Sequence, residues 1–109
     1  KIKKEIIAIV MKFGLKEDNI EKINKILSKY KNIDEARLYG SRAIGNYREG
    51  SDIDLTLKGN LDLQNLQRIV TDLDDLLLPY KFDISIFSDI NNDNLIDHIK
   101  RIGVIFYKK

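Results

Sequence analysis

The sequence predicts an α/β fold, of the α+β kind, in which a small mixed β-sheet is backed by helices. Amphipathic segments with apolar residues at helical spacing are interspersed with short segments in which apolar and polar residues alternate. A length of 109 residues suffices for one hydrophobic core, so we expect residues 1–109 to form a single domain. Helices are expected at residues 2–13, 17–31, 63–77 and 92–101. Strands are expected at residues 36–39, 52–57, 81–87 and 104–107.

The helices are predicted from apolar spacing and from the residues that end them. The first is dense in apolar residues and is followed by Gly14, which offers a stop. The second places isoleucines, a leucine and a tyrosine on one face and charged residues on the other. The third has apolar residues at the same spacing, and Pro79 is expected to end it. The last is followed by Gly103, its expected C-cap.

The strands are predicted from the alternation of apolar and polar residues. Residues 36–39 lead into Gly40, and residues 52–57 alternate isoleucine and leucines with Asp52, Asp54 and a threonine. In residues 81–87 the isoleucines alternate with polar residues, so Asp83 is expected to point away from the core. The polar sides of these strands are therefore the places where chemistry is expected.

Composition excludes several classes of protein. The chain is 43% apolar and 33% charged, which is typical of a soluble globular domain. A net charge of +2 argues against a dedicated nucleic-acid-binding protein. No apolar run approaches the roughly 20 residues of a membrane span. The absence of cysteine excludes disulfides and thiolate metal sites and favours a cytoplasmic location.

A phosphate-binding turn is predicted where the strand of residues 36–39 ends. Gly40 has no side chain, so a phosphate can come close to the backbone. Ser41 is expected to cap a short helix whose free N–H groups favour the negative charge of a triphosphate.

Acidic residues follow this turn after ten intervening residues. Asp52 and Asp54 are two apart on a strand, so their side chains leave the same face and can hold divalent metal ions. Two such ions roughly 3.5–4 Å apart can support an in-line displacement at phosphorus, and hard oxygen ligands suit Mg²⁺ or Mn²⁺. Asp83 is the candidate for a third carboxylate, which would complete a metal site or accept a proton.

Other polar residues are expected to lie outside this site. Asp72 and Asp74 are also two apart, but on a helix this spacing separates them by about 200°, so they should be solvated. His98 is expected on a helix surface. Tyr39 and Tyr47 could stack on a base, but we place neither in the site, since Tyr39 lies on an expected core strand.

Residues 38–55 carry a resemblance to a known family, with the sequence LYGSRAIGNYREGSDIDL. This stretch resembles the signature of the minimal nucleotidyltransferases, the smallest branch of the DNA polymerase beta superfamily. The resemblance extends over about residues 15–107 and implies a polymerase beta-like nucleotidyltransferase fold. It also implies that Gly40 and Ser41 bind the phosphates of a nucleoside triphosphate. Asp52, Asp54 and Asp83 would be the catalytic residues and the ligands of two magnesium ions.

The motif departs from the family pattern at one position. Many members have a second arginine where this chain has Ile44. A nucleotide contact made there must therefore come from Arg42 or Arg48.

The resemblance further implies a reaction and a partner. We expect transfer of a nucleoside monophosphate, in the first place AMP from ATP, to an acceptor hydroxyl. The family includes MntA-like antitoxins that adenylylate a small helical HEPN toxin, as well as two-subunit assemblies with HEPN proteins. A chain this short, with no acceptor-binding domain of its own, fits a HEPN partner, and a homodimer and a heterotetramer are both compatible with it.

Two alternatives stay open at this point. The chain could be a binding subunit that neutralises a HEPN partner by contact, without catalysis. It could also act on a small molecule such as an antibiotic, with the acceptor site on another chain.

Overall fold

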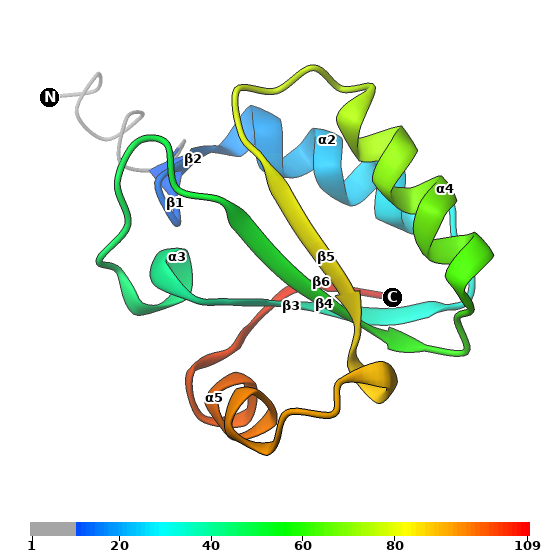
Figure 1. Ribbon diagram of the computed structural model, residues 1–109. Helices are drawn as coiled ribbons and strands as arrows, with labels where there is room; N and C mark the ends of the chain where they lie inside the picture. The colour runs from blue at the N-terminus through cyan, green and yellow to red at the C-terminus, as the bar shows by residue number, and fades with distance from the viewer. Residues whose placement is uncertain (1–10) are drawn as a thin grey trace, which may run out of the picture.

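The computed structural model describes residues 11–109, in which helices cover a mixed sheet (Figure 1). The helices are α2 (Glu17–Ser28), α3 (Ser41–Ile44), α4 (Leu63–Asp74), the 3-10 helix η1 (Phe87–Asp89) and α5 (Asp93–Ile102). The strands are β1 (Met11–Lys12), β2 (Leu15–Lys16), β3 (Ile33–Tyr39), β4 (Ile53–Gly59), β5 (Phe82–Ile86) and β6 (Val104–Lys108). Within the described residues no helix is long and apolar enough to cross a membrane.

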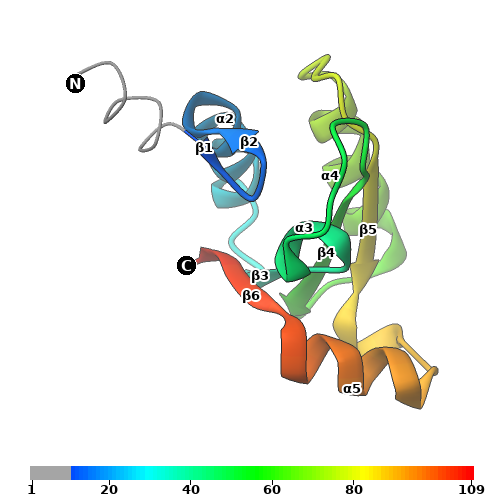
Figure 2. The same cartoon turned by 90° about the vertical axis from the view of Figure 1, so that its left-hand side faces the viewer.

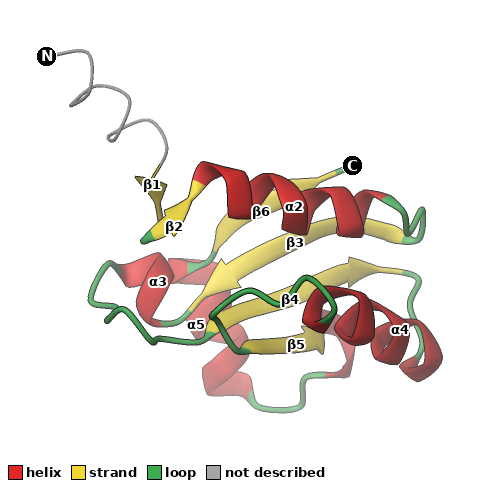
Figure 3. Ribbon diagram, turned by 90° about the horizontal axis from the view of Figure 1, so that it is seen from above, coloured by secondary structure: helices red, strands yellow, loops and turns green. Residues whose placement is uncertain are grey.

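The main sheet has the strand order β5-β4-β3-β6. β4 and β5 are parallel, and the other neighbours are antiparallel. Parallel neighbours need a crossover connection, which α4 supplies between β4 and β5. The helices α2 and α4 lie on one side of the sheet and α5 lies on the other (Figures 1 and 2). Seen from the side of α2 and α4, α5 lies behind the sheet (Figure 3). The predicted mixed sheet backed by helices is confirmed.

The core fixes which way β4 faces. Ile53, Leu55 and Leu57 are fully buried in one apolar cluster with residues of α2 and α4. Burial of each such side chain contributes roughly 1.5–3 kcal/mol to stability. Because side chains alternate along a strand, Asp54 leaves β4 on the opposite face. Packing on one face therefore determines where the carboxylate on the other face lies.

The N-terminal part differs from the predicted helix over residues 2–13. Residues 1–10 lie outside the described part of the chain, and the following residues form a hairpin of β1 and β2. Phe13 and Gly14 make its two-residue turn with φ of 58° and 73°. Two successive positive φ angles are what a tight hairpin turn requires, and they cannot continue a helix.

The helix α4 is shorter than predicted and is tied to the end of α2. It begins at a capping box formed by Asp62 and Asn65, but it ends at Asp74, well before Pro79. Asp74 is exposed as expected, whereas the expectation for Asp72 was wrong, because Asp72 accepts a hydrogen bond from the hydroxyl of Tyr30. Burial and this bond raise the pKa of Tyr30 to about 12. The pair joins the segment after α2 to the last turn of α4.

Candidate active site

A strained glycine turn joins β3 to α3. Gly40 adopts φ 74° and ψ −155°, a conformation that side-chain-bearing residues avoid. A Cβ at this position would also collide with the Oδ2 atom of Asp54. Gly40 itself occupies the N-cap of α3, so Ser41 is the first helical residue and not the cap that the sequence predicted. The turn thus brings its backbone against the carboxylate of Asp54.

The three predicted carboxylates lie at the same edge of the sheet. Asp54 on β4 pairs in register with Tyr39 on β3 and with Asp83 on β5, and directly paired residues point to the same face. Asp52 precedes β4 and is exposed. The prediction that the strands of Asp54 and Asp83 are neighbours, with both side chains on the polar face, is confirmed.

Electrostatics show that these groups affect one another. Burial raises the pKa of the half-buried Asp54, the negative charges of Asp83 and Asp52 raise it further, and the positive charge of Arg42 lowers it. Three like charges therefore gather beside the glycine turn, where a cation would relieve their repulsion.

The carboxylates form a set of hard oxygen donors without a preformed cage. Within residues 11–109, no three acidic or histidine side chains converge on one point as ligands of a single ion. This is consistent with mutual repulsion of the carboxylates, and Mg²⁺ ordinarily takes only one or two carboxylates, with water and phosphate oxygens completing its shell. The chemistry of the donor set fits Mg²⁺ or Mn²⁺ bound together with a triphosphate.

Arg42 holds the loop between α3 and β4. Its side chain is only 2% exposed, and its Nε and Nη2 atoms donate hydrogen bonds of 3.1 and 2.8 Å to the carbonyl of Ser51. Nη2 also donates to the carbonyl of Glu49 at 3.3 Å, and Nη1 donates to that of Phe13 at 2.9 Å. Because the Ser51 carbonyl belongs to the peptide that carries the nitrogen of Asp52, Arg42 positions this aspartate.

Two tyrosine rings complete the surroundings of Arg42. The guanidinium carbon lies 5.3 Å from the ring centre of Tyr47 and 5.0 Å from that of Tyr80. Arg42 was expected to contact nucleotide, but backbone carbonyls occupy four of its five N–H groups, which favours a role in holding the loop. Tyr47 likewise packs on Arg42 and not on an open base-binding surface.

Arg48 is placed differently. It is exposed, and its guanidinium has no hydrogen-bond or ion-pair partner among residues 11–109. Its backbone N–H donates to the Oγ atom of Ser51 at 2.8 Å, which fastens the loop without using the side chain. The positive charge of Arg48 is therefore available to a ligand.

Two residues near the turn have surroundings that the sequence did not predict. The Nε2 atom of His98 on α5 accepts a 3.3 Å hydrogen bond from the N–H of Gly40, so the expectation of a plain surface histidine was wrong. Tyr39 is buried as predicted. Its burial and the negative charges of Asp83 and Asp54 raise its pKa, and a hydrogen bond with Ser85 partly offsets this rise. No local pattern reveals either contact, since His98 is 58 positions from Gly40.

The acidic cluster is open to solvent, because Asp52 and Asp83 are exposed. A cavity of about 400 Å³ lies elsewhere, along α4 and beside Tyr30, and none of its lining residues belongs to the cluster. It is lined by Tyr30, Gln64, Gln67, Arg68, Thr71 and Asp72. A ligand at the acidic cluster would therefore lie on the sheet surface, accessible to a second molecule.

These features agree with the family that the chain matches. Residues 21–109 match the model of the polymerase beta nucleotidyltransferase family, so the chain belongs to this family. A sequence comparison with curated proteins gave no match. The predicted polymerase beta-like fold is confirmed.

Solved structures with the same fold include antitoxin complexes. One is a toxin–antitoxin with AMP-PNP, with TM-score 0.68, 21% identity and coverage of 84% of this chain and 74% of the other. Another is a tri-AMPylated Shewanella oneidensis HEPN toxin in complex with MNT antitoxin, with TM-score 0.64, 19% identity and coverage of 85% and 72%. A third is the toxin–antitoxin MntA-HepT, with TM-score 0.63, 18% identity and coverage of 86% and 74%. At such identities the likeness defines the fold.

Proposed function

We propose that this chain transfers AMP from ATP to a hydroxyl group of a HEPN-type partner protein, as the antitoxin of a toxin–antitoxin pair. The observation that carries the proposal is the grouping of Asp52, Asp54 and Asp83 beside the Gly40–Ser41 turn. Asp52, Asp54 and Asp83 are the proposed catalytic residues and metal ligands. Gly40, Ser41 and Arg48 are the proposed nucleotide-binding residues, and Arg42 positions the loop.

The proposed reaction is a displacement at the α-phosphorus of ATP. The acceptor oxygen forms a bond to the α-phosphorus, the bond from this phosphorus to the bridging oxygen of the β-phosphate breaks, and pyrophosphate leaves. The proton of the acceptor hydroxyl passes to a carboxylate of the cluster or to water. Bound Mg²⁺, as two ions by the family's pattern, would stabilise the charge of the attacking and leaving oxygens.

The residues of the turn would hold and orient the triphosphate. Gly40 lets a phosphate approach the backbone, and the N–H groups of Ser41 and Arg42 precede those of Ala43 and Ile44, which donate to the carbonyl of Gly40. The exposed guanidinium of Arg48 can reach a phosphate as a forked donor. Asp54 lies against the turn, so a metal ion that it binds would also meet the phosphates.

A protein acceptor is favoured by the open site and its apolar rim. Next to the turn, Ile44 is 53% exposed and Tyr47 is 39% exposed. A small-molecule acceptor ordinarily occupies a concave pocket, whereas a flat site with exposed apolar residues suits a protein surface. The solved complexes of an MNT antitoxin with an AMPylated HEPN toxin support the same acceptor class.

The test is a transfer assay with ATP labelled in the α-phosphate, Mg²⁺ and a purified HEPN partner. We expect the partner to gain the mass of one or more AMP units with the wild-type chain and none with Asp52→Asn or Asp54→Asn. Asp74→Asn is the matched control, because it removes one exposed aspartate charge on α4, away from the turn. Transfer by both site variants at the control rate would refute the assignment. Neutralisation of the partner by all variants, without a mass gain, would establish the contact-only alternative.

A further inference from the structure

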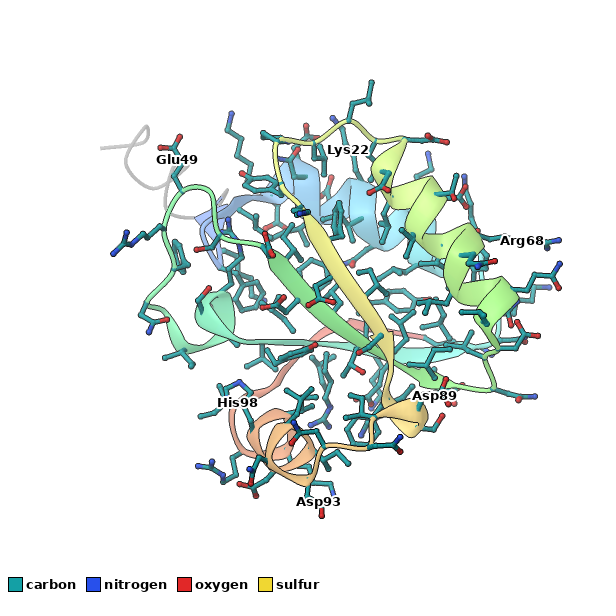
Figure 4. All side chains as sticks on the ribbon, in the orientation of Figure 1. Lys22, Glu49, Arg68, Asp89, Asp93 and His98 are labelled. Atoms are coloured by element: carbon teal, nitrogen blue, oxygen red, sulfur yellow. The ribbon has the colours of Figure 1, made fainter. Side chains whose placement is uncertain are left out.

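The hydrogen bond between the glycine turn and α5 links the predicted phosphate site to the far end of the chain. The N–H of Gly40 donates to the Nε2 atom of His98 at 3.3 Å. The His98 ring also meets the ring of Tyr39 edge-on, with centroids 6.2 Å apart and an interplanar angle of 79°. Figure 4 shows His98 on the side of α5 that faces α3. Two consecutive residues, at the end of β3 and in the turn, thus contact one imidazole.

The packing and capping of α5 hold this imidazole in place. Ile99, the next residue, is fully buried. The helix begins at Asn92, whose side chain accepts a hydrogen bond from the N–H of Leu95, and it leads directly into β6 through Gly103. His98 is half-buried, so its ring is restricted while one side remains at the surface.

Gly40 needs a restraint from another element because it has no side chain. A side chain is excluded there by the positive φ and by the collision with Asp54. Glycine has the largest conformational freedom of any residue, so a turn built on it is not fixed by its own sterics. A hydrogen bond to a side chain held by another element supplies the missing restraint.

The geometry also defines the state of the imidazole. An N–H donor can bond only to a ring nitrogen that carries no proton, so Nε2 is the acceptor and a neutral ring carries its proton on Nδ1. Glutamine can offer an oxygen acceptor in place of Nε2, whereas phenylalanine keeps an aromatic ring for Tyr39 and offers none.

We propose that His98 is a positioning residue, whose Nε2 atom fixes the Gly40 peptide and so holds the phosphate turn in register with Asp54. The proposal rests on the proposed function in one respect, namely that the turn binds the triphosphate. His98 itself acts through the backbone of Gly40 and is not a catalytic residue.

The kinetic test compares His98→Phe and His98→Gln in the transfer assay. We expect His98→Phe to raise KM for ATP about tenfold, the loss that corresponds to one hydrogen bond of about 1.4 kcal/mol, with kcat changed by less than about threefold. His98→Gln should stay within about twofold of wild type. Lys100→Gln, an exposed change on the same helix, is the control. A purely structural role would lower thermal stability in both His98 variants alike and would not separate them in KM.

A second test requires no activity. In the wild-type protein we expect the nitrogen NMR shift of His98 Nε2 to be that of an unprotonated ring nitrogen, and the Gly40 amide to exchange slowly with solvent. The exchange should accelerate in His98→Phe and stay slow in His98→Gln. A protonated Nε2, or an exchange rate of Gly40 that does not respond to His98→Phe, overturns the proposal even if a variant folds poorly. Protection of Gly40 by His98 in a protein that binds no ATP would instead refute the proposed function and leave the contact standing.

Discussion

The two arginines of the motif should respond in opposite ways to the same substitution. Arg42→Met removes four hydrogen bonds to the carbonyls of Phe13, Glu49 and Ser51, together with the contacts to two tyrosine rings. Arg48→Met removes an exposed guanidinium that has no partner among the described residues. We expect the first variant to be unstable and the second to be stable but impaired in binding ATP.

The expected size of the Arg42 effect follows from its surroundings. Hydrogen bonds to a charged group contribute about 1.5–3 kcal/mol each, but the three carbonyls lie in segments that water can reach, so about 1 kcal/mol for each carbonyl is appropriate. The two ring contacts add about 0.5–1 kcal/mol each. Arg42→Met should therefore lower the free energy of unfolding by about 4 kcal/mol. Arg42→Lys should lose roughly half of this, because an ammonium group cannot reach three carbonyls in the same fork geometry.

Urea unfolding followed by circular dichroism measures this change. With a slope of about 2 kcal/mol/M, the midpoint of Arg42→Met should fall by about 2 M, whereas that of Arg48→Met should change by less than about 0.3 M. In the transfer assay, Arg48→Met should raise KM for ATP about tenfold. An Arg42→Met midpoint equal to that of wild type would refute the argument that this side chain holds the loop.

Three further results are expected. Asp54→Asn should be more stable than wild type at pH 7 without metal. Because the pKa of Asp54 is raised in the folded protein, this carboxyl ionises in the unfolded chain first as pH rises above about 3.8, and the stability of the wild type falls over that pH range. The stability advantage of the variant should therefore vanish in urea titrations near pH 3. Gly40→Ala should lose about 1–3 kcal/mol of stability from its positive φ and should displace the carboxylate of Asp54, which lies where the Cβ would be. Gly50→Ala, where a Cβ meets nothing within 4 Å, should unfold like wild type. Equal midpoints for the two alanine variants would contradict this. Mg²⁺ at about a hundred times its Kd should stabilise the wild type by about 2.7 kcal/mol in thermal unfolding, and EDTA should reverse this stabilisation. A stabilisation of the same size in Asp54→Asn would exclude Asp54 as a metal ligand.

The elements that the sequence predicted well are those whose pattern is local. In β4 the alternation of Ile53, Leu55 and Leu57 with polar residues reports directly which face is buried, and the structure agrees. The placement of Asp83 beside Asp54 could be predicted because a short chain offers few strands as neighbours. Gly40 was recognisable because a phosphate-binding turn at the end of a strand needs a residue without a Cβ, and the positive φ of Gly40 agrees with this.

The elements that were missed depend on contacts between distant segments or on rare backbone conformations. Phe13 and Leu77 adopt positive φ, which no propensity predicts for bulky residues. The environment of Arg42 brings together carbonyls of the N-terminal hairpin and of the loop before β4. An arginine in a motif is equally compatible with a phosphate and with backbone carbonyls as partners, and only the folded chain distinguishes them.

The arrangement of the acidic cluster also bears on the choice between catalysis and binding by contact. Asp54 is half-buried between the like charges of Asp83 and Asp52, and both the burial and the repulsion cost stability. A subunit that only bound its partner, without catalysis, would be more stable with asparagine at position 54. The change would remove no contact surface, because this side chain lies on the sheet and not on the exposed rim of Ile44 and Tyr47. A cation and a triphosphate would offset the cost of the grouped carboxylates by neutralising charge at the place where it accumulates. The unfavourable electrostatics of the grouped carboxylates therefore support the proposed catalysis over the alternative of binding by contact.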